Sequence, residues 1–178
     1  MQRLPALLAV SLALSGAGVA RAQTAHNSAA PINFSADHIE LQDKANRALL
    51  SGSVSVKQAE MTLNSARMTV AYTGQVVDGS PQVSRLDAAG NVVVTRPDQT
   101  ARSNFAVYDL NKRVVTMLGA VTLIQAGNTV NGGRLTINLD TGRAVIDGSS
   151  VGGGGGKAGT TTSSGGRVSG TFSVPKRN

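Results

Sequence analysis

The 178-residue chain lacks cysteine and tryptophan altogether, and it holds only two tyrosines and three phenylalanines. The absence of cysteine excludes disulfide bonds, thiol chemistry and cysteine-ligated metal clusters. His26 and His38 are the only histidines, so the sequence predicts no multi-histidine metal site. With so few aromatic rings, we expect no surface on which nucleic-acid bases could stack.

Charged residues make up 15% of the chain, and the excess of positive charge lies at its two ends. Arg3 and Arg21 precede the body of the chain, and residues 151–178 hold four basic residues and no acid. Residues 31–150 hold 11 basic and 10 acidic residues, a net charge of +1. A basic tail attracts anionic partners only weakly, so this distribution argues against a nucleic-acid partner.

Residues 1–22 have the features of a secretory signal peptide. Arg3 supplies the positive start, an apolar run extends from Leu4 to Val19, and Ala20-Arg21-Ala22 fits a cleavage site. The run is short for a membrane-spanning helix, which needs about 20 apolar residues. We therefore expect cleavage and export, which in a bacterium with two membranes delivers the chain to the periplasm.

The rest of the chain divides by composition into three parts. Residues 23–30 read as a small, polar, flexible leader, and residues 31–150 read as one folded domain. Residues 151–178 are rich in glycine, serine and threonine, a composition typical of a disordered segment that cannot bury a core.

Short runs of alternating apolar and polar residues predict that the domain is all-β. Val54-Ser-Val56 and Leu135-Thr-Ile137 are examples, and no stretch of ten residues shows a convincing helical stripe. Short segments that begin with aspartate separate the runs. They are turn signals, because the aspartate carboxylate can bond the backbone two residues on. These signals lie at residues 43–46, 87–90, 109–111 and 140–142.

A segment that begins at Gly52 recurs without gaps at Gly119, and a weaker copy begins at Gly90. Repeats of this length indicate one supersecondary unit that is stacked. A glycine at the start of a strand often marks a bend or bulge, so we expect the chain to pass between two sheets at these three positions. The alternation also slips after Leu63 and after Val130, which predicts a bulge or a corner at both places.

The sequence offers little for catalysis. Asp37, His38 and Glu40 form its one acid–histidine cluster. His38 and Glu40 share a strand face, where they would form either a weak metal site, a general base or a solvated strand edge. No Gly-x-Ser-x-Gly motif is present, so we predict no catalytic residues and no enzyme activity.

The apolar positions of the strands are mostly aliphatic, and this pattern fits two architectures. They could fill the core of a closed sandwich. Alternatively, the two sheets could stay splayed, so that their aliphatic faces receive a lipid.

Residues 31–40, which read Pro-Ile-Asn-Phe-Ser-Ala-Asp-His-Ile-Glu, and the Gly-x-Val-x-Val strand before Gln58 resemble the OstA-like family of lipopolysaccharide-transport proteins. Tyr108-Asp-Leu and Leu118-Gly-Ala-Val fit the same template. The resemblance covers residues 31–148 and implies an OstA-like β-jellyroll, an open V-shaped pair of antiparallel sheets.

The resemblance also implies a function. Such a protein is a periplasmic lipopolysaccharide carrier that shields the acyl chains of lipid A and assembles head-to-tail by strand addition. It bridges an inner-membrane export complex and an outer-membrane translocon, and it uses no cofactor. A membrane-anchored sibling of the same pathway and a ligand-free structural β-solenoid are the alternatives.

On this basis we expect a set of apolar residues to contact acyl chains. They are Ile32, Phe34, Val54, Val56, Leu63, Met68, Val70, Leu86, Val92, Val94, Tyr108, Val121, Leu123, Leu135 and Ile137. Arg67 and Arg134 would either meet lipid phosphates or cover strand faces. Residues 32–36 and 143–147 are the candidate edges for pairing between copies.

Overall fold

A computed structural model describes residues 26–74, 81–148 and 167–171; the predicted signal peptide and most of the predicted tail lie outside them. In these segments the chain is nearly all strand, and no helix is long and apolar enough to cross a membrane. The elements are β1 (Ile32–Ser35), β2 (His38–Gln42), the 3-10 helix η1 (Asp43–Ala45), β3 (Arg47–Gln58), β4 (Met61–Thr73), β5 (Gln82–Arg96), β6 (Gln99–Asp109), β7 (Val114–Gln125), β8 (Asn128–Asn138), β9 (Ala144–Asp147) and β10 (Ser169–Thr171).

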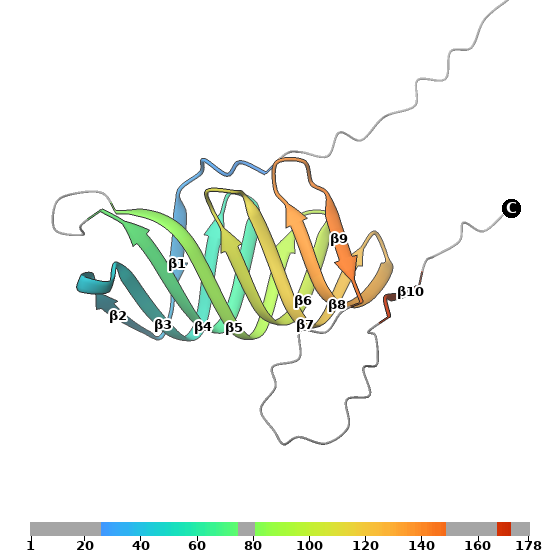
Figure 1. Cartoon of the computed structure of the whole chain (residues 1–178), viewed down its shortest axis with the longest axis horizontal. Helices are drawn as coiled ribbons and strands as arrows, with labels where there is room; N and C mark the ends of the chain where they lie inside the picture. The colour runs from blue at the N-terminus through green and yellow to red at the C-terminus, as the bar shows by residue number, and fades with distance from the viewer. Residues whose placement is uncertain (1–25, 75–80, 149–166, 172–178) are drawn as a thin grey trace, which may run out of the picture.

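The ten strands form one antiparallel sheet that bends over on itself into two layers (Figure 1). Layer A consists of β2, the first halves of β3, β5 and β7, the second halves of β4, β6 and β8, and β9. Layer B consists of β1, the other halves of the six long strands, and β10. Among the described strands, those at the two ends of the sheet do not pair with each other, so the sheet stays open.

A β-bulge near the middle of β3, β5 and β7 makes the bend, and β4, β6 and β8 bend opposite these bulges. The register shifts next to Gly52, Gly90 and Gly119, whose φ angles lie between +75° and +82°. Each glycine is followed by a second left-handed residue, with φ between +47° and +49°. Glycine reaches this conformation at little steric cost, which is why it starts each bend. The predicted corners are confirmed.

The bulge or corner predicted after Leu63 and after Val130 is confirmed as a corner. The register of β4 against β5 shifts between Asn64 and Arg67, and that of β8 against β7 shifts between Gly132 and Arg134. These shifts oppose the glycine bends of the neighbouring strands, so the whole sheet folds along one line.

The turn predicted at residues 87–90 is wrong, because these residues lie inside β5. The carboxylate of Asp87 accepts hydrogen bonds from the guanidinium of Arg85, the shortest at 2.7 Å, instead of bonding nearby backbone. Gly90 bends the strand without reversing it. The other three turn signals do separate strands; at one of them, the backbone N–H of Lys112 donates to Asp109 Oδ1 at 3.0 Å.

The core lies between the layers. Among the described residues, it consists of 23 apolar residues that form one cluster, each with at most 7% of its surface exposed. Both layers contribute to it by strict alternation along their strands, so each layer covers the inner face of the other. The predicted fold class, all-β with an open pair of antiparallel layers, is confirmed.

Candidate functional site

Thirteen of the fifteen residues predicted to contact acyl chains lie in the buried cluster between the layers. Leu63, Leu135 and Ile137 have no exposed surface, and Leu123 is the most exposed of the thirteen at 6%. Alternation in the sequence therefore identified the inner face of both layers. In this structure the middle of the interior is filled by the protein's own side chains.

Among the described residues, ten further buried apolar residues were not predicted to contact acyl chains. They are Ala48, Leu50, Met61, Tyr72, Ala88, Ala101, Ala106, Val115, Met117 and Leu139. Several continue an alternation that was already visible: Val115 and Met117 lie on β7 before the bend, at two-residue spacing. The alanines carry too weak an apolar signal to be distinguished from surface positions.

The inner face continues to the N-terminal end of the sheet, where the opposite layer no longer covers it. Phe34 of β1 pairs with the buried Val56, and Ile39 of β2 pairs with the buried Leu50. Directly paired residues point to the same face of a sheet. Nevertheless Phe34, Ile39 and Leu41 are 48%, 42% and 58% exposed. Apolar side chains of both layers are thus presented to solvent at this end.

At the other end of the interior, next to the turn between β7 and β8, lies a pocket of about 210 Å³. Leu123, Gln125, Ala126, Asn128 and Val130 line it, and Leu123 pairs with Val130 across the hairpin. The pocket is smaller than the roughly 300–1,000 Å³ typical of small-molecule sites. It is therefore an opening into the interior and not a complete lipid site.

The layers are continuous along the bends and separate along the opposite side, which we call the mouth. Across the mouth, the hydroxyl of Tyr108 in layer A donates to Gln58 Oε1 in layer B at 2.7 Å. Tyr108 is 1% exposed, and its burial raises the pKa of the phenol, so the hydroxyl keeps the proton it donates. A buried polar bond therefore closes the mouth over an otherwise aliphatic interior.

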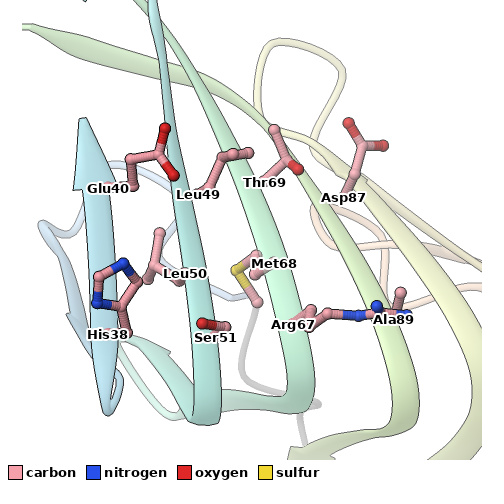
Figure 2. A pocket seen from close by; sticks show the side chains of 10 residues that line it. All are labelled: His38, Glu40, Leu49, Leu50, Ser51, Arg67, Met68, Thr69, Asp87 and Ala89. Atoms are coloured by element: carbon pink, nitrogen blue, oxygen red, sulfur yellow. The ribbon is translucent and has the colours of Figure 1, made fainter. Parts of the chain in front are cut away.

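A larger concavity, of about 390 Å³, lies on the outer face of layer A. Figure 2 shows its side chains in two rows that cross β2, β3, β4 and β5. The rows are Glu40, Leu49, Thr69 and Asp87, and His38, Ser51, Arg67 and Ala89. On β3, β4 and β5 these positions alternate with buried ones, so they face away from the interior. His38 and Glu40 share that face, because they pair with Ser51 and Leu49.

His38 and Glu40 of the acid–histidine cluster line this outer concavity, at a solvated strand edge. His38 and Glu40 are exposed, and Glu40 Oε1 accepts a hydrogen bond from Gln42 Nε2 at 2.7 Å. Asp87 is paired with Arg85 at 2.7 Å. Within the described parts of the chain, no three histidine, aspartate or glutamate side chains are grouped so as to hold a metal ion.

Arg67 and Arg134 also face outward. Each is followed by a buried inner residue, Met68 at 2% exposure and Leu135 at 0%. Because neighbouring residues of a strand point to opposite faces, both guanidinium groups cover the outside of layer A.

The two candidate pairing edges lie at opposite ends of the molecule but in different layers. Residues 32–35 form β1, the N-terminal edge of layer B, and residues 144–147 form β9, the C-terminal edge of layer A. Within one layer, the strand opposite β9 is β2 and the strand opposite β1 is β10.

The chain is similar in sequence to known proteins. A family model described as "LptA/(LptD N-terminal domain) LPS transport protein" matches residues 33–143. An uncharacterized protein of Rhizobium meliloti (strain 1021) is 29% identical over 121 residues, which is 66% of this chain. The chain spans 65% of that relative's length.

Among solved structures, the chain is similar to LptH of Pseudomonas aeruginosa, described as the LptA homologous periplasmic component of the conserved lipopolysaccharide transport device. The TM-score is 0.67 with 20% sequence identity, over 84% of this chain and 99% of LptH, which shows a shared fold. The family model covers well over half of the chain, from β1 to the turn before β9. The chain therefore belongs to the LptA/LptD N-terminal domain family of lipopolysaccharide (LPS) transport proteins.

Proposed function

We propose that this chain is a periplasmic carrier that shields the acyl chains of lipid A while lipopolysaccharide passes between the inner and outer membranes. The observation that carries the proposal is an aliphatic interior that runs the length of an open sheet. Its middle is buried, and its N-terminal end presents Phe34, Ile39 and Leu41 to solvent. A structural core alone does not require exposed apolar side chains where the interior ends.

The energetics of an acyl chain in water make such an interior useful. Burial of one methylene is worth about 0.8 kcal/mol, so a chain of about a dozen carbons costs on the order of 10 kcal/mol when exposed. Several chains on one lipid multiply this cost. A continuous aliphatic surface removes it without one deep binding site from which the lipid would leave slowly.

The interior has to widen before lipid enters, because its own side chains fill it in this structure. The hydrogen bonds of the sheet join neighbouring strands within each layer. The layers can therefore separate at the mouth by opening the bends, with the strand pairing intact. The side chains that pack between the layers are apolar, and acyl chains would offer them packing of the same kind once the layers part.

Unpaired edges at both ends of the sheet support head-to-tail assembly. An exposed strand edge is a template for pairing with another chain, and proteins normally cover such edges. Addition of β2 of one copy to β9 of the next would extend layer A. The exposed Phe34, Ile39 and Leu41 would then continue the interior across the junction. The two ends of such an assembly would meet the inner-membrane export complex and the outer-membrane translocon.

A matched pair of substitutions tests the lipid-binding proposal. Ile39 and Ile124 are exposed to nearly the same degree, 42% and 40%, but Ile39 faces the interior and Ile124 lies next to the inner Leu123, on the outer face. Burial of an isoleucine contributes about 1.5–3 kcal/mol, so Ile39→Asp should weaken lipopolysaccharide binding at least tenfold. Ile124→Asp should leave the affinity unchanged.

The measurement is the affinity of the dilute, monomeric full chain for lipopolysaccharide, with gel filtration as a control for folding. Equal affinities of the two variants would refute the interior as the lipid site, and no binding by the unmodified chain would favour a ligand-free structural protein. Sequencing of the mature N-terminus distinguishes a carrier cleaved before Gln23 from a membrane-anchored sibling.

A further inference from the structure

The segment before β1, residues 26–31, lies across the mouth of the interior, and we call it the strap. Figure 1 shows it (blue) along the side of the molecule where the turns between strands lie, before the chain descends into β1. The side chain of His26 is only 6% exposed, although it belongs to a short polar segment without regular secondary structure.

Gln58, at the end of β3 in layer B, holds the strap. Its amide nitrogen donates to the backbone carbonyl oxygens of Ser28 and Ala30, both at 3.0 Å. Its amide oxygen lies 3.2 Å from Nε2 of His26. Gln58 is 2% exposed, so these contacts are shielded from water. In such a buried site a broken hydrogen bond is costly, because water does not replace the lost partner.

The same amide oxygen accepts the hydroxyl of Tyr108 from layer A, at 2.7 Å. One buried side chain thus joins three parts of the molecule: the strap, layer B and layer A. Separation of the layers at the mouth pulls Tyr108 away from Gln58 and breaks the hydrogen bond between the layers. Movement of the strap removes the carbonyl acceptors of Gln58.

We propose that the strap is a releasable closure of the lipid interior, held shut by Gln58, and that it leaves the mouth when acyl chains enter. This inference rests on the proposed lipid-carrier function and adds its regulation. The strap is suited to release, because Asn27, Ala29 and Pro31 are exposed, and because its other hydrogen bonds to described residues are short-range ones within residues 26–30. It can therefore detach without disturbing the pairing of β1, which begins at Ile32.

Gln99 provides a matched control. It lies on layer B at the start of β6, on the same side of the mouth, and is 6% exposed. Its amide nitrogen has no hydrogen-bond partner within the described segments. Gln58→Met and Gln99→Met are therefore the same substitution at two buried positions, and methionine has nearly the volume of glutamine. Of the two positions, only Gln58 holds the strap.

The first measurement is the rate at which the full mature chain takes up N-phenyl-1-naphthylamine, an apolar fluorophore. Gln58→Met removes the hydrogen bonds to the Ser28 and Ala30 carbonyls and the one from Tyr108. Loss of even one buried hydrogen bond corresponds to a factor of roughly ten, so Gln58→Met should accelerate uptake at least about tenfold and Gln99→Met should not. If Gln58→Met does not fold, Tyr108→Phe removes the bond between the layers by loss of one oxygen and should also accelerate uptake. Equal rates in the Gln58 and Gln99 variants would overturn the proposal.

The second measurement is hydrogen–deuterium exchange of residues 26–31 in the unmodified chain, with and without lipopolysaccharide. Exchange in the strap should increase when the lipid binds, while the amides of β4 and β6 stay protected. Binding with unchanged or reduced exchange would refute the strap as a closure and leave the carrier function intact. If lipopolysaccharide does not bind at all, the carrier function fails and the strap proposal fails with it.

Discussion

Replacement of Gly52 by alanine tests how tightly the first bend is packed. The φ angle of Gly52 is +75°, and its carbonyl oxygen accepts the backbone N–H of Asp37 at 2.9 Å. A Cβ at position 52 would overlap Oδ2 of Asp37 and lie 2.8 Å from its Cβ. The hydrogen bond keeps Asp37 against the glycine, so the aspartate cannot simply move aside.

Two costs add in this variant. The left-handed conformation costs an alanine about 1–2 kcal/mol, and overpacking typically costs about 1–3 kcal/mol. We therefore expect Gly52→Ala to lower the free energy of unfolding by about 2–5 kcal/mol. Gly127 isolates the first cost, because its φ is +79° but an added Cβ would meet nothing within 4 Å. Gly127→Ala should lose only about 1–2 kcal/mol.

Equilibrium urea denaturation measures both variants, and the slope of the transition shows whether each still unfolds in one step. We expect Gly52→Ala to be less stable than Gly127→Ala by at least about 1 kcal/mol. If the two lose the same free energy, the contact with Asp37 does not constrain the bend and the reasoning is refuted.

Three further predictions follow from individual residues. Ala120→Gly should raise the free energy of unfolding by up to about 1 kcal/mol, because Ala120 has a φ of +49°; a decrease would contradict the strained bend. Hydrogen bonds from the Lys112 side chain and backbone lower the pKa of Asp109, so the stability that Asp109 provides is present above about pH 4 and lost as the pH falls through its folded-state pKa. Urea midpoints should therefore decline less between pH 5 and pH 2 in Asp109→Asn; an unchanged profile would exclude this source. Leu63→Ala should lower the free energy of unfolding by about 2–5 kcal/mol, whereas Leu41→Ser, at a 58% exposed site, should change it by less than about 0.5 kcal/mol. Leu41→Ser should nevertheless weaken self-association, as measured by sedimentation velocity. Unaltered association would exclude that end of the sheet as the junction.

The bends were predictable because glycine at the start of a strand has a specific physical meaning and because the repeat placed it three times. The second left-handed residue was not predictable at the bends of β3 and β7, since Ser53 and Ala120 have no preference for that conformation, whereas Asn91 in β5 does favour it. The turn expected at Asp87 was wrong because the local signal, an aspartate with a glycine three residues later, is the same for a reversal and for a bulge. Only the pairing with Arg85 and the length of β5 distinguish them.

The inner face was predictable from alternation, but its degree of cover was not. Phe34 follows the inner parity, yet it is 48% exposed because β1 lies at the end of the sheet. The bond between Gln58 and Tyr108 was also beyond the sequence. It joins residues 50 positions apart, and it depends on how the two layers face each other, which no local pattern encodes.

The most direct test of the lipid interior is photocrosslinking in cells that make lipopolysaccharide. A photoreactive amino acid is placed at the inner positions Val56, Met68 and Leu123, and at the outer neighbours Thr69 and Thr122 as controls. The inner positions should form lipopolysaccharide adducts and the outer ones should not. Adducts of equal yield on both faces, or adducts at the outer positions alone, would contradict the account.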